Sequence, residues 1–167
     1  MHREYKEFLR VAFCLNTKLG IIPLLYGSLG LQQLVAEELF PKDIDILVPQ
    51  EFINEKWIDL KESIENIGYH LVDLHEHEFL YGRYKIAFSF IEDLIEFAEI
   101  FEKDIEIIED KEIKYKILDL YQYLRVYERS INDNYRKEKN NSKDFNKIRI
   151  IKAEIVKKRQ LTNASTL

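Results

Sequence analysis

One stretch of the sequence restricts the possible folds more than any other. An apolar run over residues 21–26 stops at Gly27-Ser28, and after a helical pattern comes an alternation of acidic and aliphatic residues over 43–48. The apolar run predicts a short buried strand, because Gly27-Ser28 breaks it just before the helical pattern. Backbone N–H groups at a helix start face an anion, and phosphate is the natural occupant. The order strand, turn, helix, strand indicates a mixed α/β fold.

The second strand of this pattern carries two carboxylates. In Asp43-Ile44-Asp45-Ile46 the period of two puts Asp43 and Asp45 on one side and the isoleucines on the other. Because a strand rises ~3.3 Å per residue, the carboxylates lie roughly 7 Å apart along it. Such hard oxygen ligands suit magnesium, which takes one or two carboxylates and completes its shell with water and substrate phosphates. The alternative is a solvated edge strand, on which acid and isoleucine also alternate and no metal is needed.

The order and spacing of these residues resemble the nucleotidyltransferase superfamily, which has the polymerase-beta-like fold. The mark of that family is a hydrophobic strand, Gly-Ser, a helix and then Asp-x-Asp, and here these positions are Gly27, Ser28, Asp43 and Asp45. The resemblance covers residues 21–100 and implies a nucleotidyltransferase-like mixed sheet flanked by helices. It also implies a nucleoside triphosphate (NTP) as substrate, with both aspartates and a third carboxylate from a later strand binding Mg²⁺ or Mn²⁺ ions.

The third carboxylate must come from the strand predicted at residues 84–91, which lies beside the Asp43 strand if the family topology holds. Glu92 shares its parity with the apolar residues of that strand. We predict Glu92 as the third metal ligand and catalytic residue, since a same-side oxygen ligand is needed. Asp93 is the alternative, although an aspartate there also suits the N-cap of the next helix. If neither residue serves, the core binds nucleotides without efficient transfer.

Several cations near the motif are candidates for contacts with the triphosphate. Lys42 directly precedes the Asp-x-Asp motif, and Arg83 and Lys85 follow a predicted hairpin turn. Each could reach phosphate oxygens, although cations on a solvated strand are often only solvated. The predicted nucleotide-binding set is therefore Gly27, Ser28, Lys42 and Arg83.

Three other segments carry residues with possible chemistry. Tyrosines within 121–127 could offer an aromatic face to a nucleobase, and the alternative is that they pack the helix on the sheet. Lys143-Asp144-x-x-Lys147 is similar to a Lys-Asp element in the helical parts of some bacterial nucleotidyltransferases. Residues 73–77 place Asp73, His75 and His77 on one side if their strand continues, which would suit zinc, and the alternative is an exposed hairpin end.

The rest of the chain predicts one core with a helical extension. Residues 1–103 form the nucleotidyltransferase-like core, with an N-terminal helix that stops at Gly20, helices over 28–39 and 51–67, and strands over 69–74 and 84–91. Residues 104–167 form a C-terminal helical tail packed on the core. It begins with a strand or loop near residues 105–108 and continues with helices from 115 or 118 to about 136 and over 145–156.

Composition excludes several classes of protein. The net charge of −5 does not favour nucleic acid as a partner, although local basic patches can survive an acidic total. The single cysteine, Cys14, rules out an internal disulfide and lies in an apolar run that favours burial. The N-terminus is charged and no apolar run approaches the ~20 residues that span a bilayer, so we expect a cytoplasmic protein without membrane contact.

The resemblance implies transfer of a nucleoside monophosphate from an NTP to an unidentified hydroxyl acceptor, either a small molecule or a protein, by two-metal catalysis. The alternative is a catalytically weak or inactive protein of this fold, which acts as an antitoxin or regulatory partner through its sheet face or helical tail. A third reading is an ordinary α/β domain in which the motif is a coincidence. It predicts no metal-dependent nucleotide binding.

Overall fold

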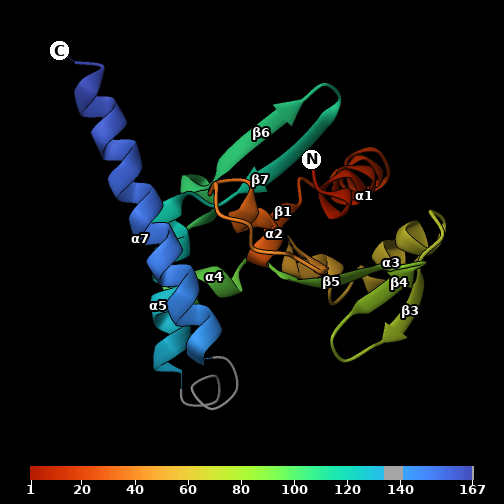
Figure 1. Cartoon of the computed structure of the whole chain (residues 1–167). Helices are drawn as coiled ribbons and strands as arrows, with labels where there is room; N and C mark the ends of the chain where they lie inside the picture. The colour runs from red at the N-terminus through yellow and green to blue at the C-terminus, as the bar shows by residue number, and fades with distance from the viewer. Residues whose placement is uncertain (134–140, 167) are drawn as a thin grey trace.

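A seven-stranded mixed sheet forms the centre of the computed structural model, which describes residues 1–133 and 141–166 (Figure 1). The strands are β1 (Leu24–Tyr26), β2 (Asp43–Val48), β3 (His70–Asp73), β4 (Glu78–Tyr81), β5 (Tyr84–Phe90), β6 (Glu106–Asp110) and β7 (Ile113–Ile117). The helices are α1 (Arg3–Leu19), α2 (Gly27–Gln32), α3 (Trp57–Glu65), α4 (Asp93–Ala98), α5 (Leu120–Asn132) and α7 (Asn141–Ala164), with single 3₁₀ turns η1 (Gln50–Phe52) and η2 (Glu102–Asp104). The predicted class, a mixed α/β sheet flanked by helices, is confirmed.

The strand order is β3-β4-β5-β2-β1-β7-β6. β2 lies in the middle, antiparallel to β1 on one side and parallel to β5 on the other. β1 is also parallel to β7, which forms an antiparallel hairpin with β6. This order places the Asp-x-Asp strand directly between the strand that precedes Gly27 and the strand that precedes Glu92.

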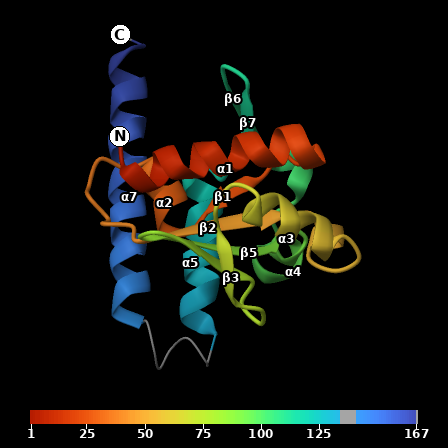
Figure 2. The same cartoon turned by 90° about the vertical axis from the view of Figure 1, so that its right-hand side faces the viewer.

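Each face of the sheet has its own hydrophobic core. On one face α1 and α3 cover the aliphatic side of β2, where Ile44 and Ile46 are completely buried. On the other face α4, α5 and α7 pack around Leu24 and Leu47. In Figures 1 and 2 α5 and α7 lie side by side on the side of the sheet away from α1. One side of β2 is therefore aliphatic and buried, and the other carries Asp43, Asp45 and then the buried Leu47.

The N-terminal helix is as predicted. Gly20 has φ 65° and ends α1, with its backbone N–H donating to the carbonyl oxygen of Asn16. Glycine adopts this left-handed conformation without the steric cost of a Cβ atom, so it is a common residue at a helix end. Cys14 is buried on α1, as expected.

The two elements around Gly27 are shorter than predicted. β1 begins only at Leu24, because Pro23 has no backbone N–H to pair with a neighbouring strand. The helix predicted over 28–39 ends at Gln32. There the Gln32 side chain donates to the carbonyl oxygen of Glu37 at 3.1 Å and accepts from the backbone N–H of Leu39 at 2.6 Å. These bonds hold an irregular loop where the apolar pattern alone predicted a helix.

Two strands and one break in a helix were not predicted. β4 follows the segment 74–77, which turns back, so β3, β4 and β5 form a meander. β7 was assigned to the start of a helix, but it pairs with β1 and β6. The single helix predicted over 51–67 is divided in two: its start is the 3₁₀ turn η1, and α3 begins only at Trp57.

Helix α5 starts later than its apolar pattern suggested, whereas α7 starts earlier and extends further than predicted. Asp119 caps α5 because its carboxylate accepts from the Gln122 backbone N–H at 2.8 Å, while the Gln122 side chain accepts from the Asp119 N–H at 2.9 Å. The end predicted near Arg136 and most of the predicted polar connector 137–142 lie outside the described residues. Residues 141–142 already belong to α7.

Candidate functional site

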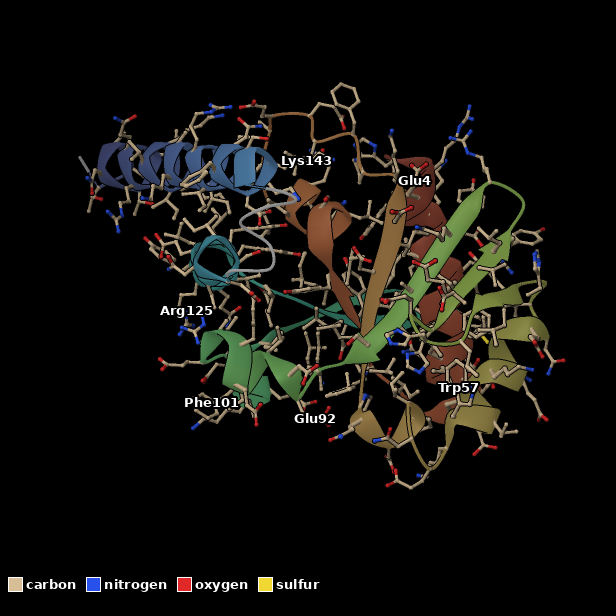
Figure 3. All side chains as sticks on the ribbon, turned by 90° about the horizontal axis from the view of Figure 1, so that it is seen from below. Glu4, Trp57, Glu92, Phe101, Arg125 and Lys143 are labelled. Atoms are coloured by element: carbon tan, nitrogen blue, oxygen red, sulfur yellow. The ribbon has the colours of Figure 1, made fainter. Side chains whose placement is uncertain are left out.

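A cleft of about 1150 Å³ lies between the carboxylate side of the sheet and helices α5 and α7. The sheet contributes Tyr26 and Asp45, the start of α2 contributes Gly27 and Ser28, and the C-terminal helices contribute Tyr127, Arg129, Lys143 and Lys147. Figure 3 shows Lys143 near the start of α7 and Arg125 on α5. The cleft therefore joins the predicted motif to the C-terminal helices, which are far away in the sequence.

Gly27 is in direct contact with the second aspartate of the motif. Tyr26 and Asp45 are paired across β1 and β2, so the residue after Tyr26 lies beside the Asp45 side chain. A Cβ atom built on Gly27 would lie 2.3 Å from Asp45 Oδ2, and Gly27 has φ 64°. Both the backbone conformation and the close approach require glycine at this position. The sequence thus places a turn with no side chain immediately beside a carboxylate.

Asp43 and Asp45 differ in their surroundings. Asp43 is exposed and forms an ion pair with Lys85 at 3.5 Å, whereas Asp45 is half-buried and lines the cleft. Burial and then the Asp43 carboxylate raise the pKa of Asp45, and the positive charges of Lys147 and Lys85 act in the opposite direction. Glu78 of β4 also raises this pKa, so three acidic groups share one region of the molecule with two ammonium groups, one from β5 and one from α7.

The raised pKa of Asp45 has a consequence for stability. Because its folded-state pKa lies above the ordinary value of an aspartate, the folded protein binds more protons than the unfolded chain between the two values. The free energy of unfolding therefore falls as pH rises through that window and stays lower at neutral pH.

We expect Asp45→Asn to stabilise the protein at pH 7, because it removes a buried charge at nearly constant shape. The gain should be on the order of 1 kcal/mol, or about 2–4 °C in Tm for a chain of this size. It should shrink in melts at a pH below the ordinary pKa of aspartate, where Asp45 is already neutral. Asp110→Asn on the exposed edge strand β6 is the matched control. A lower Tm for Asp45→Asn at pH 7 would contradict this prediction.

Glu92 does not join the two aspartates. It follows Ala87, the residue paired with Asp45, by five positions and lies two residues beyond the end of β5. The Glu92 carboxylate instead accepts a hydrogen bond from the Gln50 backbone N–H at 3.0 Å. Figure 3 shows Glu92 just beyond the arrowhead of β5. Within the described residues, the expected grouping of Glu92 with Asp43 and Asp45 is not formed.

The alternative, Asp93, lines the far part of the cleft, at the start of α4. Burial and the nearby Glu96 and Glu92 raise its pKa. It lies one residue further from Ala87 than Glu92 does. Across residues 1–133 and 141–166, no group of three or more histidine, cysteine, aspartate or glutamate side chains is arranged to hold a metal ion. The carboxylate site on β2 consists of two aspartates.

The predicted phosphate contacts divide into two groups. Gly27 and Ser28 line the cleft. Lys42 is exposed just before β2, and Arg83 lies in the β4–β5 turn, where it pairs with Glu4 of α1 at 3.6 Å. Neither Lys42 nor Arg83 is among the described residues that line the cleft.

The histidine segment is a turn and not a continued strand. Asp73 Oδ1 accepts from the Glu76 backbone N–H at 3.0 Å, and His77 has φ 51°. His75 and His77 line the cleft. The His77 ring packs edge-on against Trp57 with 4.9 Å between ring centroids, and burial lowers its pKa.

A buried hydrogen bond joins the two helices that form the wall opposite Asp45. Asp144 of α7 is only 8% exposed, and its Oδ2 accepts from Ser130 Oγ of α5 at 2.7 Å. One turn further along α7, the Lys147 ammonium lies 4.9 Å from the centroid of the Tyr127 ring. The Lys-Asp pattern drew attention to Asp144, but nothing in the sequence indicated Ser130, because the alignment of α5 with α7 is tertiary.

The tyrosines of α5 have separate roles. Tyr123 is fully buried, and its hydroxyl donates to the Gly27 carbonyl oxygen at 3.2 Å. Tyr127 lines the cleft, whereas Tyr121 is exposed and accepts from Arg159 at 2.9 Å. The sequence did not indicate the hydrogen bond from Tyr123 to Gly27, which connects α5 to the Gly-Ser motif.

Comparison with known proteins finds a relative by sequence and a solved structure of similar fold. No family model matches the chain. It is 48% identical over 147 residues to the uncharacterized protein YnaI of Bacillus subtilis (strain 168), over 88% of this chain and 94% of YnaI. The solved structure of ANT(2″)-Ia in complex with adenylyl-2″-tobramycin is similar with a TM-score of 0.62 and 10% identity, over 98% of this chain and 97% of that chain. ANT(2″)-Ia is an aminoglycoside nucleotidyltransferase, so the predicted nucleotidyltransferase-like fold is confirmed. No helix in the described ranges is both long enough and apolar enough to cross a membrane.

Proposed function

The chain belongs to the protein family that includes YnaI of Bacillus subtilis, and we propose that it binds a magnesium nucleoside triphosphate and transfers the nucleoside monophosphate to a hydroxyl acceptor. The coarse part of this proposal is the nucleotidyltransferase-like fold, which it shares with ANT(2″)-Ia. The finer part rests on the residues of the cleft.

One observation carries the proposal: the contact between Gly27 and Asp45. Gly27 has no side chain, and this leaves room for the Asp45 carboxylate. A Cβ atom on residue 27 would lie only 2.3 Å from Asp45 Oδ2. A positive φ alone does not require such an approach: Gly20 and Gly82 also have positive φ, but a Cβ atom added at either would meet nothing within 4 Å. The approach brings open backbone at residues 27–28 and a carboxylate to one wall of a cleft.

The donors present fit a magnesium ion that arrives with a triphosphate. Magnesium usually takes one or two carboxylates from the protein and keeps water or phosphate oxygens in its other positions. Asp43 and Asp45 would supply these carboxylates, so this coordination does not require a third protein carboxylate. When bound, the ion would neutralise phosphate charge and help to orient the α-phosphate for attack.

The residues of the chain would act mainly by binding and positioning. Gly27 and Ser28 line the cleft, and their backbone would contact the phosphates. We assign the contacts from the helical wall to Lys143 and Lys147, because both line the cleft, while the roles predicted for Lys42 and Arg83 stay predictions. The acceptor oxygen forms a bond to the α-phosphorus as the bond to the bridging oxygen breaks, so pyrophosphate leaves and the hydroxyl proton passes to solvent.

The size of the cleft favours a small acceptor. Ligand pockets commonly measure about 300–1,000 Å³, and this cleft of about 1150 Å³ would hold a nucleotide with a second small molecule beside it. ANT(2″)-Ia was crystallised with a nucleotidylated small molecule, adenylyl-2″-tobramycin. A hydroxyl-bearing small molecule is therefore our first choice of acceptor, and a protein side chain is the second.

A regulatory role without efficient transfer is the second candidate function. It is favoured by one observation, the alanine at position 87 of β5, where the strand next to Asp45 presents no carboxylate. Under this function the protein binds the nucleotide and uses its sheet face or helical tail to engage a protein partner. Nucleotide binding with no pyrophosphate release against any acceptor would support it.

The test is a calorimetric titration with ATP, GTP, CTP and UTP, each with and without Mg²⁺. We expect magnesium-dependent binding of at least one triphosphate to the wild type. Asp43→Asn/Asp45→Asn should weaken that binding at least tenfold, because it removes both charged ligands at nearly constant shape.

The matched control is Glu106→Gln/Asp110→Asn, which removes two carboxylates from the exposed edge strand β6. It should bind nucleotides like the wild type. Equal affinity of the Asp43→Asn/Asp45→Asn variant and the wild type would overturn the site assignment. Thermal melts of all variants would show that each one is folded.

A further inference from the structure

Lys85 is the cation that touches the aspartate site most directly. β2, β5 and β4 are neighbours, and Lys85 of β5 is paired with Asp43 of β2. Its Nζ atom lies 3.5 Å from Asp43 Oδ2 and 3.5 Å from Glu78 Oε1 of β4. One ammonium group therefore bridges two carboxylates that come from strands on either side of it.

The row of residues next to Lys85 explains how Glu78 reaches this position. Asp45 is paired with Ala87, and Ala87 is paired with Glu78. Residues paired across adjacent strands point to the same face, so Asp45, Ala87 and Glu78 form one row. Because the middle residue is only an alanine, no bulky side chain separates Glu78 from the aspartates.

The three side chains are partly exposed, so either ion pair of Lys85 can break and re-form. Lys85 is 35% exposed, Asp43 is 49% exposed and Glu78 is 26% exposed. Ion pairs with this degree of exposure are individually weak. A divalent cation that arrives with a triphosphate can therefore replace the Lys85 ammonium at Asp43.

We infer that Lys85 sets the specificity of the aspartate site for its cation: it competes with a free divalent cation for Asp43, and Glu78 holds the displaced ammonium when a cation–triphosphate complex binds. The inference rests on the proposed function, because it assumes that Asp43 and Asp45 bind the cation. A free divalent ion meets the repulsion of Lys85. A cation–triphosphate complex carries a net negative charge, so the same ammonium attracts it.

The first test is a titration with Mn²⁺ alone, followed by the loss of the free Mn²⁺ signal in electron paramagnetic resonance. We expect Lys85→Met to bind free Mn²⁺ about threefold to tenfold more tightly than the wild type, in line with the loss of two exposed ion pairs. Lys85→Arg keeps the charge and should stay close to the wild type. Unchanged or weaker binding by Lys85→Met overturns the inference.

Lys114→Met is the matched control for the loss of a positive charge. Lys114 also forms a strand ion pair, with Glu109 at 3.0 Å, but on the β6–β7 hairpin. It should leave the affinity for Mn²⁺ unchanged. A similar gain in Lys114→Met would mean that only net charge matters, and it would overturn the specific role of Lys85.

The role of Glu78 is tested by a double-mutant cycle with the same readout. If Glu78 acts through Lys85, Glu78→Gln leaves the ammonium on Asp43 and weakens Mn²⁺ binding, whereas in the Lys85→Met background it has no effect. An equal loss in both backgrounds would make Glu78 a metal ligand itself and overturn its positioning role.

The second test compares free Mn²⁺ with its complex with a non-hydrolysable ATP analogue. Lys85→Met should tighten binding of the free ion while leaving binding of the complex unchanged or weaker. Tightening of both by the same factor overturns the claim of specificity. If Asp43→Asn/Asp45→Asn binds Mn²⁺ as well as the wild type, the proposed function itself fails. If that variant is weakened and Lys85→Met is not altered, only the inference about Lys85 fails.

Discussion

Replacing Gly30 by alanine should lower the free energy of unfolding by roughly 3 kcal/mol, or about 6–12 °C in Tm. A Cβ atom at this position would lie 2.1 Å from the Tyr123 hydroxyl oxygen and 2.6 Å from the Leu25 carbonyl oxygen. Neither neighbour can move easily, because Leu25 belongs to β1 and Tyr123 is completely buried. Gly30 has no positive φ, so the whole cost comes from the contact and none from backbone conformation.

A second substitution separates the two contacts. Tyr123→Phe removes the hydroxyl that lies 2.1 Å from the added atom but leaves the Leu25 carbonyl in place. In the Tyr123→Phe background, Gly30→Ala should therefore lower the free energy of unfolding by less than it does in the wild type, but still lower it. Urea or thermal unfolding of Tyr123→Phe and of the double variant measures this difference. A Gly30→Ala protein within 1 kcal/mol of the wild type would contradict the close packing of α2 against β1 and α5.

This packing also indicates how much of the fold could be predicted from sequence. The alternation from Asp43 to Ile46 was sufficient to predict β2 and which of its sides carries the carboxylates, because that information is local. The same reasoning missed β7, whose pairing with β1 is parallel and connects residues far apart in the chain. It also extended α2 beyond Gln32, since the hydrogen bonds that hold the following loop depend on one glutamine side chain.

The candidate site was predictable to a similar extent. Gly27 and Asp45 were chosen from order and spacing, and the structure places them in contact. The third carboxylate could not be chosen in this way, because it depends on the register between β2 and β5. That register pairs Asp45 with Ala87 and leaves Glu92 beyond the end of the strand. The partners of Lys85 also come from two different strands, so no spacing in the sequence could indicate them.

Gly27→Ala should impair both stability and nucleotide binding, unlike any other glycine substitution in a turn of this chain. Gly27 has φ 64°, and an alanine in this left-handed conformation costs about 1–2 kcal/mol. The added Cβ atom would also lie 2.3 Å from Asp45 Oδ2 and 3.2 Å from Asp45 Cγ, so the carboxylate has to turn away from the cleft. We expect magnesium-dependent triphosphate affinity to fall at least tenfold, since a displaced ligand no longer matches the octahedral geometry that magnesium demands.

Gly20→Ala and Gly82→Ala are controls for the backbone cost alone. Both glycines have positive φ, 65° and 56°, and an added Cβ atom would meet nothing within 4 Å at either position. They should lose a similar free energy of unfolding in thermal melts but keep the nucleotide affinity of the wild type in calorimetry. If Gly27→Ala binds the triphosphate as well as these two controls, the close approach of Gly27 to Asp45 is not needed for nucleotide binding. If its affinity falls while theirs does not, the nearby carboxylate requires the absence of a side chain at position 27 in addition to the requirement of the backbone conformation.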